Sequence, residues 1–290
     1  MSAEKDSGTV GLIGIGLLGT ALAERLMEAG FSVWGYDRAA AAMHRFSEIG
    51  GQPVLRIRDV AIAASRIVLC LPDSDCVEEV VVRIIPALKA GTVLIDTTTG
   101  EPGRTRTLAD RLATADIALL DASVLGSSEV TRSGDATLLV GGTPQDLNRS
   151  RPVLEAVSSK IHHVGPVGSG QEMKLVANLV LGLNRAALAE GLHFAKTLEL
   201  NLNVVLEVLQ SGAAWSRVMD VKGRKMIDED FAPQARLSQH LKDVRLILQQ
   251  AATAETSLPL SEVHRRLLEQ VAAAGDGDLD NSAVIRAWNA

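Results

Sequence analysis

Hydrophobic and polar positions follow different periods in the two parts of the chain. Up to about residue 167, short apolar runs alternate with stretches of helical periodicity. The apolar runs predict buried strands at 9–13, 31–36, 67–71, 92–96, 118–123, 136–141 and 160–164. The stretches between them predict helices at 20–29, 39–49, 77–87, 105–114 and 143–157. This alternation is typical of a parallel sheet with helices on both faces.

From Gln171 onward the pattern is helical and contains no predicted strand. The predicted helices cover 171–198, 204–211, 215–225, 237–252, 259–274 and 282–287. We therefore expect an α/β domain over residues 1–167 and an all-helical domain over residues 168–290, joined by a long helix.

The first strand runs into Gly14, Gly16 and Gly19, which stand between a strand and a helix as a dinucleotide-binding turn requires. Gly14 and Gly16 allow a tight turn and a close approach of a pyrophosphate, and Gly19 allows the helix to pack on the strand. The helix would direct its free amides toward the phosphates. A glycine-rich turn alone is weak evidence, but this one lies in the full strand–turn–helix–strand context. The N-terminal domain is thus expected to be a Rossmann NAD(P)-binding domain.

The second strand ends at Asp37, about twenty residues beyond the glycines. A carboxylate there accepts hydrogen bonds from both ribose hydroxyls and repels a 2′-phosphate, which favours NAD. Arg38 follows directly and is able to pair with a 2′-phosphate, so NADP remains open.

Composition narrows the possible partners. The chain has 290 residues, 47% of them hydrophobic, and a formal charge of −6 without a dense basic run, which argues against nucleic acid. Two cysteines and six histidines show neither a disulfide framework nor metal-ligand spacing, so no metal is expected. No signal-peptide pattern precedes the first strand, and the apolar stretch 175–192 contains polar and charged residues, so we expect a cytoplasmic protein without a membrane segment.

Lys174 and Asn178 lie four residues apart on the first long helix and so project from one face. A positioned ammonium donates a proton to a carbonyl oxygen during hydride transfer, and the neutral amine accepts it back in alcohol oxidation. Partial burial would lower the pKa of such a lysine. The alternative is a lysine whose stem covers apolar surface while its head reaches water.

The chain resembles the β-hydroxyacid dehydrogenases, a family that includes 3-hydroxyisobutyrate dehydrogenase and tartronate semialdehyde reductase. The resemblance covers nearly the whole chain. It rests on the glycine-rich segment 11–19, Leu71-Pro72, the loop 96–102, Gly168-Ser169-Gly170 followed by Lys174 and Asn178, Lys242-Asp243, and the segment 277–280.

The resemblance implies an NAD(P)-dependent oxidoreductase that acts on a small hydroxy acid or semialdehyde, with a helical domain like that of 6-phosphogluconate dehydrogenase. Lys174 would be the general acid and base, and Asn178 would orient the substrate or Lys174. The cofactor-binding residues would be Gly14, Gly16, Leu17, Leu18, Gly19, Asp37, Arg38, Leu71, Pro72, Thr99 and Lys242. Thr99 is alternatively a helix cap, and Lys242 alternatively belongs to an ordinary solvated helix face.

The loop expected to bind the substrate carboxylate departs from the family pattern. Where the family has Asp-Ala-Pro-Val-Ser-Gly-Gly, this chain reads Asp-Ala-Ser-Val-Leu-Gly-Ser-Ser at 121–128. Leu125 replaces the expected serine, while Ser123, Ser127, Ser128 and the amides near Gly126 remain possible donors to an anion. The substrate is therefore not transferable from a familiar member.

Three further interpretations stay open. A non-catalytic dinucleotide sensor or scaffold would keep the glycine turn but would not need Lys174 and Asn178. An imine reductase has a similar two-domain plan, but Lys174 argues against it. The residues Arg236, Gln239, His240 and Lys242, together with Trp215 and Arg217, either line a pocket or belong to a solvated helix with Trp215 in the core, and no catalytic role is expected for His240. An apolar face on the long helix favours a homodimer or homotetramer.

Overall fold

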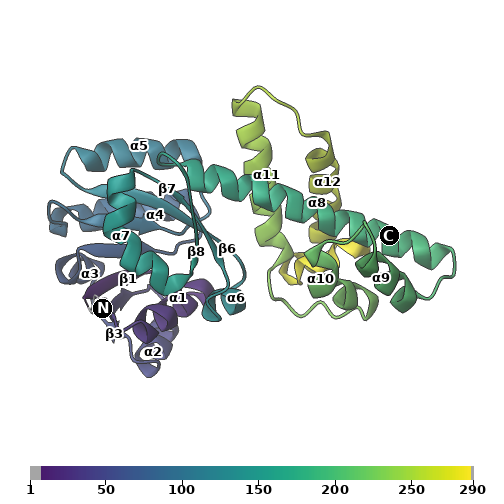
Figure 1. Ribbon diagram of the computed structural model, residues 1–290, viewed down its shortest axis with the longest axis horizontal. Helices are drawn as coiled ribbons and strands as arrows, with labels where there is room; N and C mark the ends of the chain where they lie inside the picture. The colour runs from purple at the N-terminus through teal and green to yellow at the C-terminus, as the bar shows by residue number, and fades with distance from the viewer. Residues whose placement is uncertain (1–7, 289–290) are drawn as a thin grey trace. The chain divides into compact units, whose positions relative to one another are not determined.

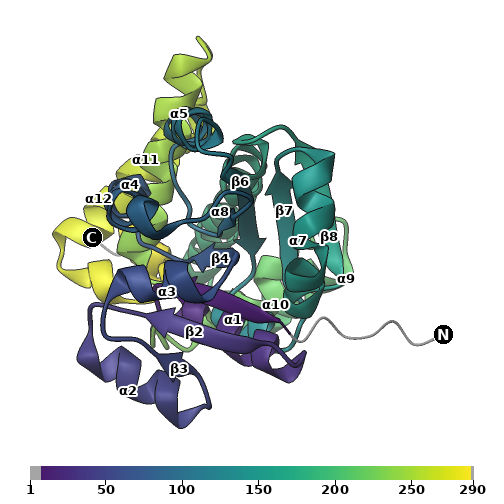
Figure 2. The same cartoon turned by 90° about the vertical axis from the view of Figure 1, so that its left-hand side faces the viewer.

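The computed structural model describes residues 8–288 and divides into two compact units, one ending at Lys174 and the other beginning at Leu175. The first unit is built on one eight-stranded sheet with the order β3-β2-β1-β4-β5-β6-β7-β8. Its strands are β1 (Thr9–Ile13), β2 (Ser32–Tyr36), β3 (Gln52–Pro53), β4 (Arg66–Leu69), β5 (Val93–Asp96), β6 (Ala118–Leu125), β7 (Thr137–Gly141) and β8 (Lys160–Gly165). Figure 2 shows the strands of this sheet in a second view.

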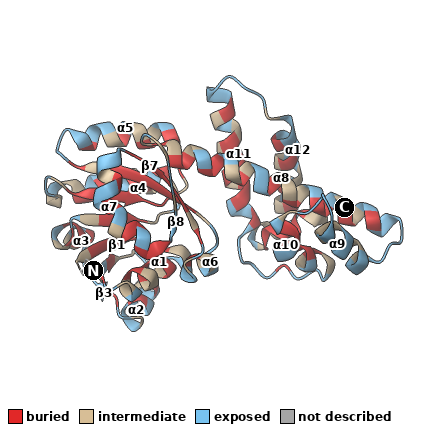
Figure 3. Ribbon diagram, viewed as in Figure 1, coloured by how far each residue is buried: buried red, intermediate tan, exposed pale blue. Residues whose placement is uncertain are grey.

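Helices cover both faces of the sheet (Figure 1). One face packs α1 (Leu17–Glu28), α2 (Ala40–Glu48) and α7 (Pro144–Val157) in a cluster that includes Leu12, Leu26 and Phe46. The other packs α3 (Ile57–Ala63), α4 (Ser74–Ile84) with the 3₁₀ turn η1 (Ile85–Ala87), and α5 (Pro102–Ala113). The inner strands β1, β4, β5, β6 and β7 are buried almost throughout (Figure 3), because a sheet covered on both faces requires continuous apolar runs, whereas the edge strands β3 and β8 are largely exposed.

The sequence predicts a parallel sheet, and this is correct except at one position. Strands β6 and β7 pair antiparallel, whereas every other neighbouring pair is parallel. Their connection contains only the short helix α6 (Ser128–Arg132), which is too short to carry the chain across the face of the sheet.

Three short elements, β3, α3 and α6, were not predicted. The strand β3 has only two residues, and α3 and α6 have seven and five, so their apolar periodicity is brief. Several predicted helices also begin earlier in the structure, among them α1 at Leu17 and α5 at Pro102. A proline at the first helical position is favourable because its missing N–H has no intrahelical acceptor there.

The second unit is helical. It contains the part of α8 (Ser169–Thr197) that follows Lys174, then α9 (Leu202–Ser211), α10 (Arg217–Ile227), α11 (Leu237–Thr253), α12 (Pro259–Ala273), η2 (Asp276–Asp278) and η3 (Asn281–Trp288). Its core joins residues such as Leu188, Met226, Val244 and Leu268. The last element was predicted as an α-helix and is a 3₁₀ helix. The predicted fold class, a Rossmann domain followed by a helical domain, is confirmed.

Helix α8 is long and apolar enough to span a membrane by length and composition, and it is the one such helix in residues 8–288. A buried core helix satisfies the same test. Lys174, Asn178 and Arg185 on this helix are buried within the protein, and 39% of its most apolar window is buried.

Candidate functional site

The turn after β1 has the geometry that a dinucleotide needs. A Cβ on Gly14, whose φ is +95°, would lie 2.1 Å from the carbonyl oxygen of Cys70, and a Cβ on Gly19 would lie 2.0 Å from that of Gly14. Gly16, by contrast, faces open space within 4 Å and caps α1 without a side-chain hydrogen bond. The turn lies where the sheet order reverses between β1 and β4, the usual position of a dinucleotide in such sheets.

Asp37 is hydrogen-bonded to the same turn. Its carboxylate accepts the amide of Ile15 at 2.7 Å and the amide of Ala39 at 2.8 Å. Each carboxylate oxygen has a further lone pair, so acceptance from ribose hydroxyls remains possible. Asp37 thus fixes the glycine turn as well as offering a ribose acceptor.

Two neighbouring loops at the carboxyl edge are hydrogen-bonded to each other. The hydroxyl of Thr98 accepts the amide of Leu71 at 3.1 Å, and the hydroxyl of Ser74 accepts the amide of Glu101 at 2.8 Å. Arg104 pairs with Asp75, Glu78 and Glu101 at 2.7, 2.8 and 3.3 Å. These contacts hold the loops after β4 and β5, which carry Pro72 and Thr99.

The remaining cofactor candidates differ in exposure. Leu17 is 80% exposed at the start of α1, whereas the side chain of Leu18 packs against the core. Arg38 and Pro72 are exposed, and Leu71 and Thr99 are half-buried. The turn, the open face at Gly16 and the carboxylate of Asp37 together fit an NAD(P) molecule.

Strand β6 positions Lys174. The ammonium of Lys174, which is 9% exposed, donates to the carbonyl oxygen of Val124 at 2.5 Å. Three residues earlier on the same strand, Asp121 accepts the amides of Gly168 at 2.7 Å and Gln171 at 2.8 Å, at the start of α8. One strand therefore holds both the first turn of α8 and the lysine of its second turn.

Gln171 adds a link from α8 to the loop after β5. This side chain, 2% exposed, accepts from the hydroxyl of Thr105 at 2.9 Å and donates to the carbonyl oxygen of Thr98 at 3.4 Å. The position of Lys174 is thereby coupled to a loop of the predicted cofactor site.

The substrate-loop candidates follow directly on β6. Asp121, Ser123 and Leu125 share one face of the strand, because side chains alternate along it. Ser123 is 1% exposed and its hydroxyl has no hydrogen-bond partner within residues 8–288. Ser127 caps α6 by accepting the amide of Val130 at 3.2 Å, Gly126 is exposed, and Ser128 is half-buried.

In the second unit, Asn178 donates to the carboxylate of Asp243 at 3.1 Å. Lys242 is half-buried, with its ammonium 4.0 Å from an oxygen of Asp243. The Asn178 amide is therefore fixed by α11, with its carbonyl oxygen not used in that bond.

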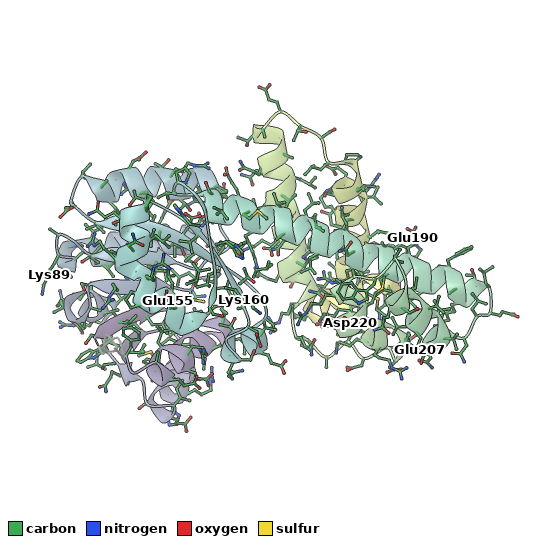
Figure 4. All side chains as sticks on the ribbon, viewed as in Figure 1. Lys89, Glu155, Lys160, Glu190, Glu207 and Asp220 are labelled. Atoms are coloured by element: carbon green, nitrogen blue, oxygen red, sulfur yellow. The ribbon has the colours of Figure 1, made fainter. Side chains whose placement is uncertain are left out.

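The candidate pocket residues on α10 and α11 do not behave as a group. Arg236, Gln239 and Arg217 are exposed, whereas His240 is buried, so the solvated-helix interpretation is wrong for His240. Trp215 is 52% exposed and its indole N–H contacts Asp220 at 3.3 Å, so the interpretation of Trp215 as core filler is also wrong. Asp220, labelled in Figure 4, is itself exposed.

Sequence reasoning missed Asp121 and Gln171 as supports of Lys174. An acid inside an otherwise apolar strand and a polar residue directly after Gly168-Ser169-Gly170 were the available signals. Within residues 8–288 no group of three or more His, Cys, Asp or Glu is placed to hold a metal ion.

Comparison with known proteins agrees with this geometry. Residues 9–165 match the family model of the NAD binding domain of 6-phosphogluconate dehydrogenase. Residues 168–288 match the model of the NAD-binding domain of NADP-dependent 3-hydroxyisobutyrate dehydrogenase.

Curated relatives cover nearly the whole chain. The 2-(hydroxymethyl)glutarate dehydrogenase of Eubacterium barkeri is 31% identical, over 96% of this chain and 94% of the relative. The 2-hydroxy-3-oxopropionate reductase of Escherichia coli is also 31% identical, over 96% of each chain. The L-threonate dehydrogenase of Pectobacterium atrosepticum is 27% identical, over 97% and 94%.

Among solved structures, 3-hydroxyisobutyrate dehydrogenase from Mycobacterium tuberculosis has a TM-score of 0.90 at 26% identity, covering 98% of this chain and 99% of that one. An imine reductase from Pseudomonas has a TM-score of 0.65 at 17% identity, covering 98% and 100%, and shares the fold alone. By its motifs, its two matched domain models and its relatives, this chain belongs to the β-hydroxyacid dehydrogenase family of NAD(P)-dependent oxidoreductases.

Proposed function

We propose that this protein interconverts a small hydroxy acid and the corresponding semialdehyde, with Lys174 as the general acid and base. The observation that carries the proposal is the buried ammonium of Lys174, held on the Val124 carbonyl oxygen at the end of β6. The relatives named above act on small hydroxy acids or the related carbonyl compound, which supports this substrate class.

In oxidation, the neutral amine of Lys174 accepts the proton of the substrate hydroxyl, while a hydride leaves the carbon atom that carries this hydroxyl. NAD(P), when bound, accepts that hydride. In reduction, the Lys174 ammonium returns the proton to the forming alkoxide. The hydrogen bond to the Val124 carbonyl oxygen holds the Lys174 side chain in one orientation. The Asn178 amide, held by Asp243, orients the substrate.

The substrate carboxylate is assigned to the end of β6, with the hydroxyls of Ser123 and Ser127 and the amides around Gly126 as donors. The unpartnered hydroxyl of Ser123 supports this assignment. Leu125 on the same strand face offers an apolar contact in place of the usual serine hydroxyl, so this loop would select a substrate different from that of a familiar member.

Three finer assignments accompany the proposal. NAD is preferred over NADP, because Asp37 lies beside the glycine turn while Arg38 is exposed. The protein acts in the cytoplasm. It works as a homodimer or homotetramer, because Val176, Val180 and Phe194 on α8 are 54%, 52% and 62% exposed.

The test is turnover measured by absorbance of the reduced nicotinamide, with NAD and NADP and a panel of small hydroxy acids and semialdehydes. Lys174→Ala is expected to lower kcat by about 100-fold or more while cofactor affinity is retained. The reason is that general acid–base catalysis accelerates a reaction by roughly 10²- to 10⁴-fold. Lys196→Ala, on the exposed end of the same helix, is the matched control and should keep full activity.

Cofactor binding without turnover of any compound in the panel would instead support a dinucleotide sensor. Full activity in Lys174→Ala would refute the role of the lysine and leave the oxidoreductase assignment intact.

A further inference from the structure

A cluster of nitrogen donors lies inside the second unit. Arg185 from α8, His240 from α11 and His264 from α12 are 4%, 7% and 2% exposed. The two imidazole ring centroids are 5.1 Å apart. Both rings cover Gly182, where an added Cβ would lie 2.7 Å from His240 Nε2 and from His264 Cε1.

Four nitrogens of these side chains are buried without a hydrogen-bond partner in the described part of the chain. Within residues 8–288, Nε and Nη1 of Arg185 and Nε2 of both histidines are buried without an acceptor or donor opposite them. A buried guanidinium with unpartnered nitrogens destabilises a protein, so such a group is normally matched by an anion.

Asp280, the carboxylate that acts on Arg185, does not pair with it by a hydrogen bond in the described residues. Asp280 acts electrostatically on Arg185, but its oxygens already accept from Lys222 at 2.9 Å and from the hydroxyl of Ser282 at 2.7 Å. The amides of Gln234, Ala235 and Ser282 complete the coordination of Asp280. Asp280 is therefore satisfied without Arg185.

The cluster carries a single positive charge at neutral pH. Burial lowers the pKa of Arg185 to about 10, which leaves it charged. Burial and the neighbouring Arg185 lower the pKa of His264 to about 4, and burial, Arg185 and His264 lower that of His240 well below its ordinary value. Two neutral imidazoles, each able to donate one N–H, thus flank one cation.

We propose that Arg185, His240 and His264 form a second anion site, and that its ligand is a single carboxylate group. One negative charge balances one guanidinium, and two carboxylate oxygens supply enough lone pairs for the unpartnered donors. A metal cation is disfavoured by the charge of Arg185. A dianionic phosphate would leave one charge uncompensated.

The position on α8 suggests where the carboxylate comes from. Arg185 follows Asn178 by seven residues, so both lie on one helix face, with Gly182 and the covering imidazoles between them. If the proposed function holds, a substrate oriented by Asn178 would reach Arg185 with a distal carboxylate. The substrate would then be a dicarboxylic hydroxy acid. A separate carboxylic acid would use the same contacts.

The test of the site does not need catalysis. The full-length protein is heated without nicotinamide nucleotide while glutarate, acetate or chloride is titrated at constant ionic strength. The carboxylates, and not chloride, should raise Tm in a saturable manner. Arg185→Met should weaken carboxylate binding about tenfold or more, as expected for a charge-assisted hydrogen bond. Arg266→Met, an exposed position on α12, should bind as the wild type does.

An unchanged Tm with every carboxylate, or an unchanged affinity in Arg185→Met, would overturn the site. His264→Phe keeps the ring volume and Arg185 but removes one donor. It should weaken binding several-fold, and it serves as the decisive variant where Arg185→Met does not fold.

Turnover then separates the two sources of the carboxylate. If the carboxylate belongs to the substrate, Arg185→Met should raise KM about tenfold for dicarboxylic hydroxy acids and leave KM unchanged for monocarboxylic hydroxy acids. If carboxylates bind at Arg185 but Arg185→Met leaves KM unchanged, the site is supported and a substrate carboxylate as its ligand is refuted. Absence of turnover in the wild type contradicts the proposed function, while the binding measurement still decides the site.

Discussion

Asp96 and Asp121 occupy paired positions on adjacent parallel strands, yet they hold different parts of the molecule. Asp96 accepts the amide of Thr98 at 2.9 Å in the loop after β5, and burial raises its pKa to about 7. Burial also raises the pKa of Asp121, although amides of Gly168 and Gln171 act against it. These two paired carboxylates thus support the loop after β5 and the start of α8 respectively.

Replacing Asp121 by Asn tests this difference. The amide retains one acceptor oxygen, so one N–H at the start of α8 loses its partner. Stability should fall by about 2–3 kcal/mol, and kcat should fall more than the affinity for the cofactor. Urea unfolding and steady-state kinetics measure the two effects. Asp110→Asn, exposed on α5, is the control, and a purely proportional loss of cofactor affinity and kcat would contradict a role through Lys174.

Asp37 makes a separate prediction about the cofactor. Asp37→Ser removes the charge that disfavours a 2′-phosphate and one of the two carboxylate oxygens that accept the amides of Ile15 and Ala39. The KM for NAD should rise about tenfold, and the ratio of kcat/KM for NADP over NAD should increase. Kinetics with both cofactors give the ratio, and an unchanged ratio would remove Asp37 from cofactor selection.

Residues that act through neighbours close in sequence were predictable, while those that act through distant partners were not. Gly14, Gly16 and Asp37 lie in one strand–turn–helix–strand unit whose geometry is local. Asp121 accepts hydrogen bonds from residues 47 and 50 positions away, and no spacing in the sequence predicts these hydrogen bonds. The same holds for Arg185, whose histidine neighbours come from two other helices.

At the scale of elements, a buried ion pair connects α10 to the segment before η3. Lys222 contacts both oxygens of Asp280 at 2.9 Å, and these side chains are 9% and 0% exposed. Burial raises the pKa of Asp280, but the hydrogen bonds from Lys222 and Ser282 outweigh it and bring the pKa to about 2. The segment 277–280, noted from the sequence, therefore has a structural role in the second unit.

Asp280→Asn should cost about 3–5 kcal/mol, because it leaves Lys222 charged and buried without a counterion. Since the pKa of Asp280 is lower in the folded protein than in the unfolded chain, its contribution is complete above about pH 4 and is lost as pH falls toward 2. Unfolding free energies are measured from pH 7 down to pH 3. Their decrease with falling pH should be smaller for the variant than for the wild type. The control Asp228→Asn lies at the end of α10.

Long elements were predicted from their periodicity, and the errors concern short ones. The reversal of β7 depends on the length of its connection, and α3 and α6 offer at most two turns of pattern. The register of the sheet and the packing of α11 on α12 depend on contacts across the chain, which a single sequence does not display.

At the scale of the whole molecule, the exposed apolar residues of α8 predict self-association. Val180→Glu should shift the protein from an oligomer toward a 30.7 kDa monomer, because a charge would be buried in the interface. Sedimentation velocity at micromolar concentration measures the change. Ile62→Glu, 56% exposed on α3, is the matched control, and a monomeric wild type would contradict the prediction.

The division between the two compact units falls between Lys174 and Leu175, inside a continuous helix. For protein engineering, this makes α8 a natural splice point between relatives. A chimera joined at Leu175 would inherit Asp121, Val124 and Lys174 from one parent, and Asn178 with the Arg185 cluster from the other. We therefore expect such chimeras to exchange the residues around Lys174 and the proposed carboxylate site at Arg185 independently of each other.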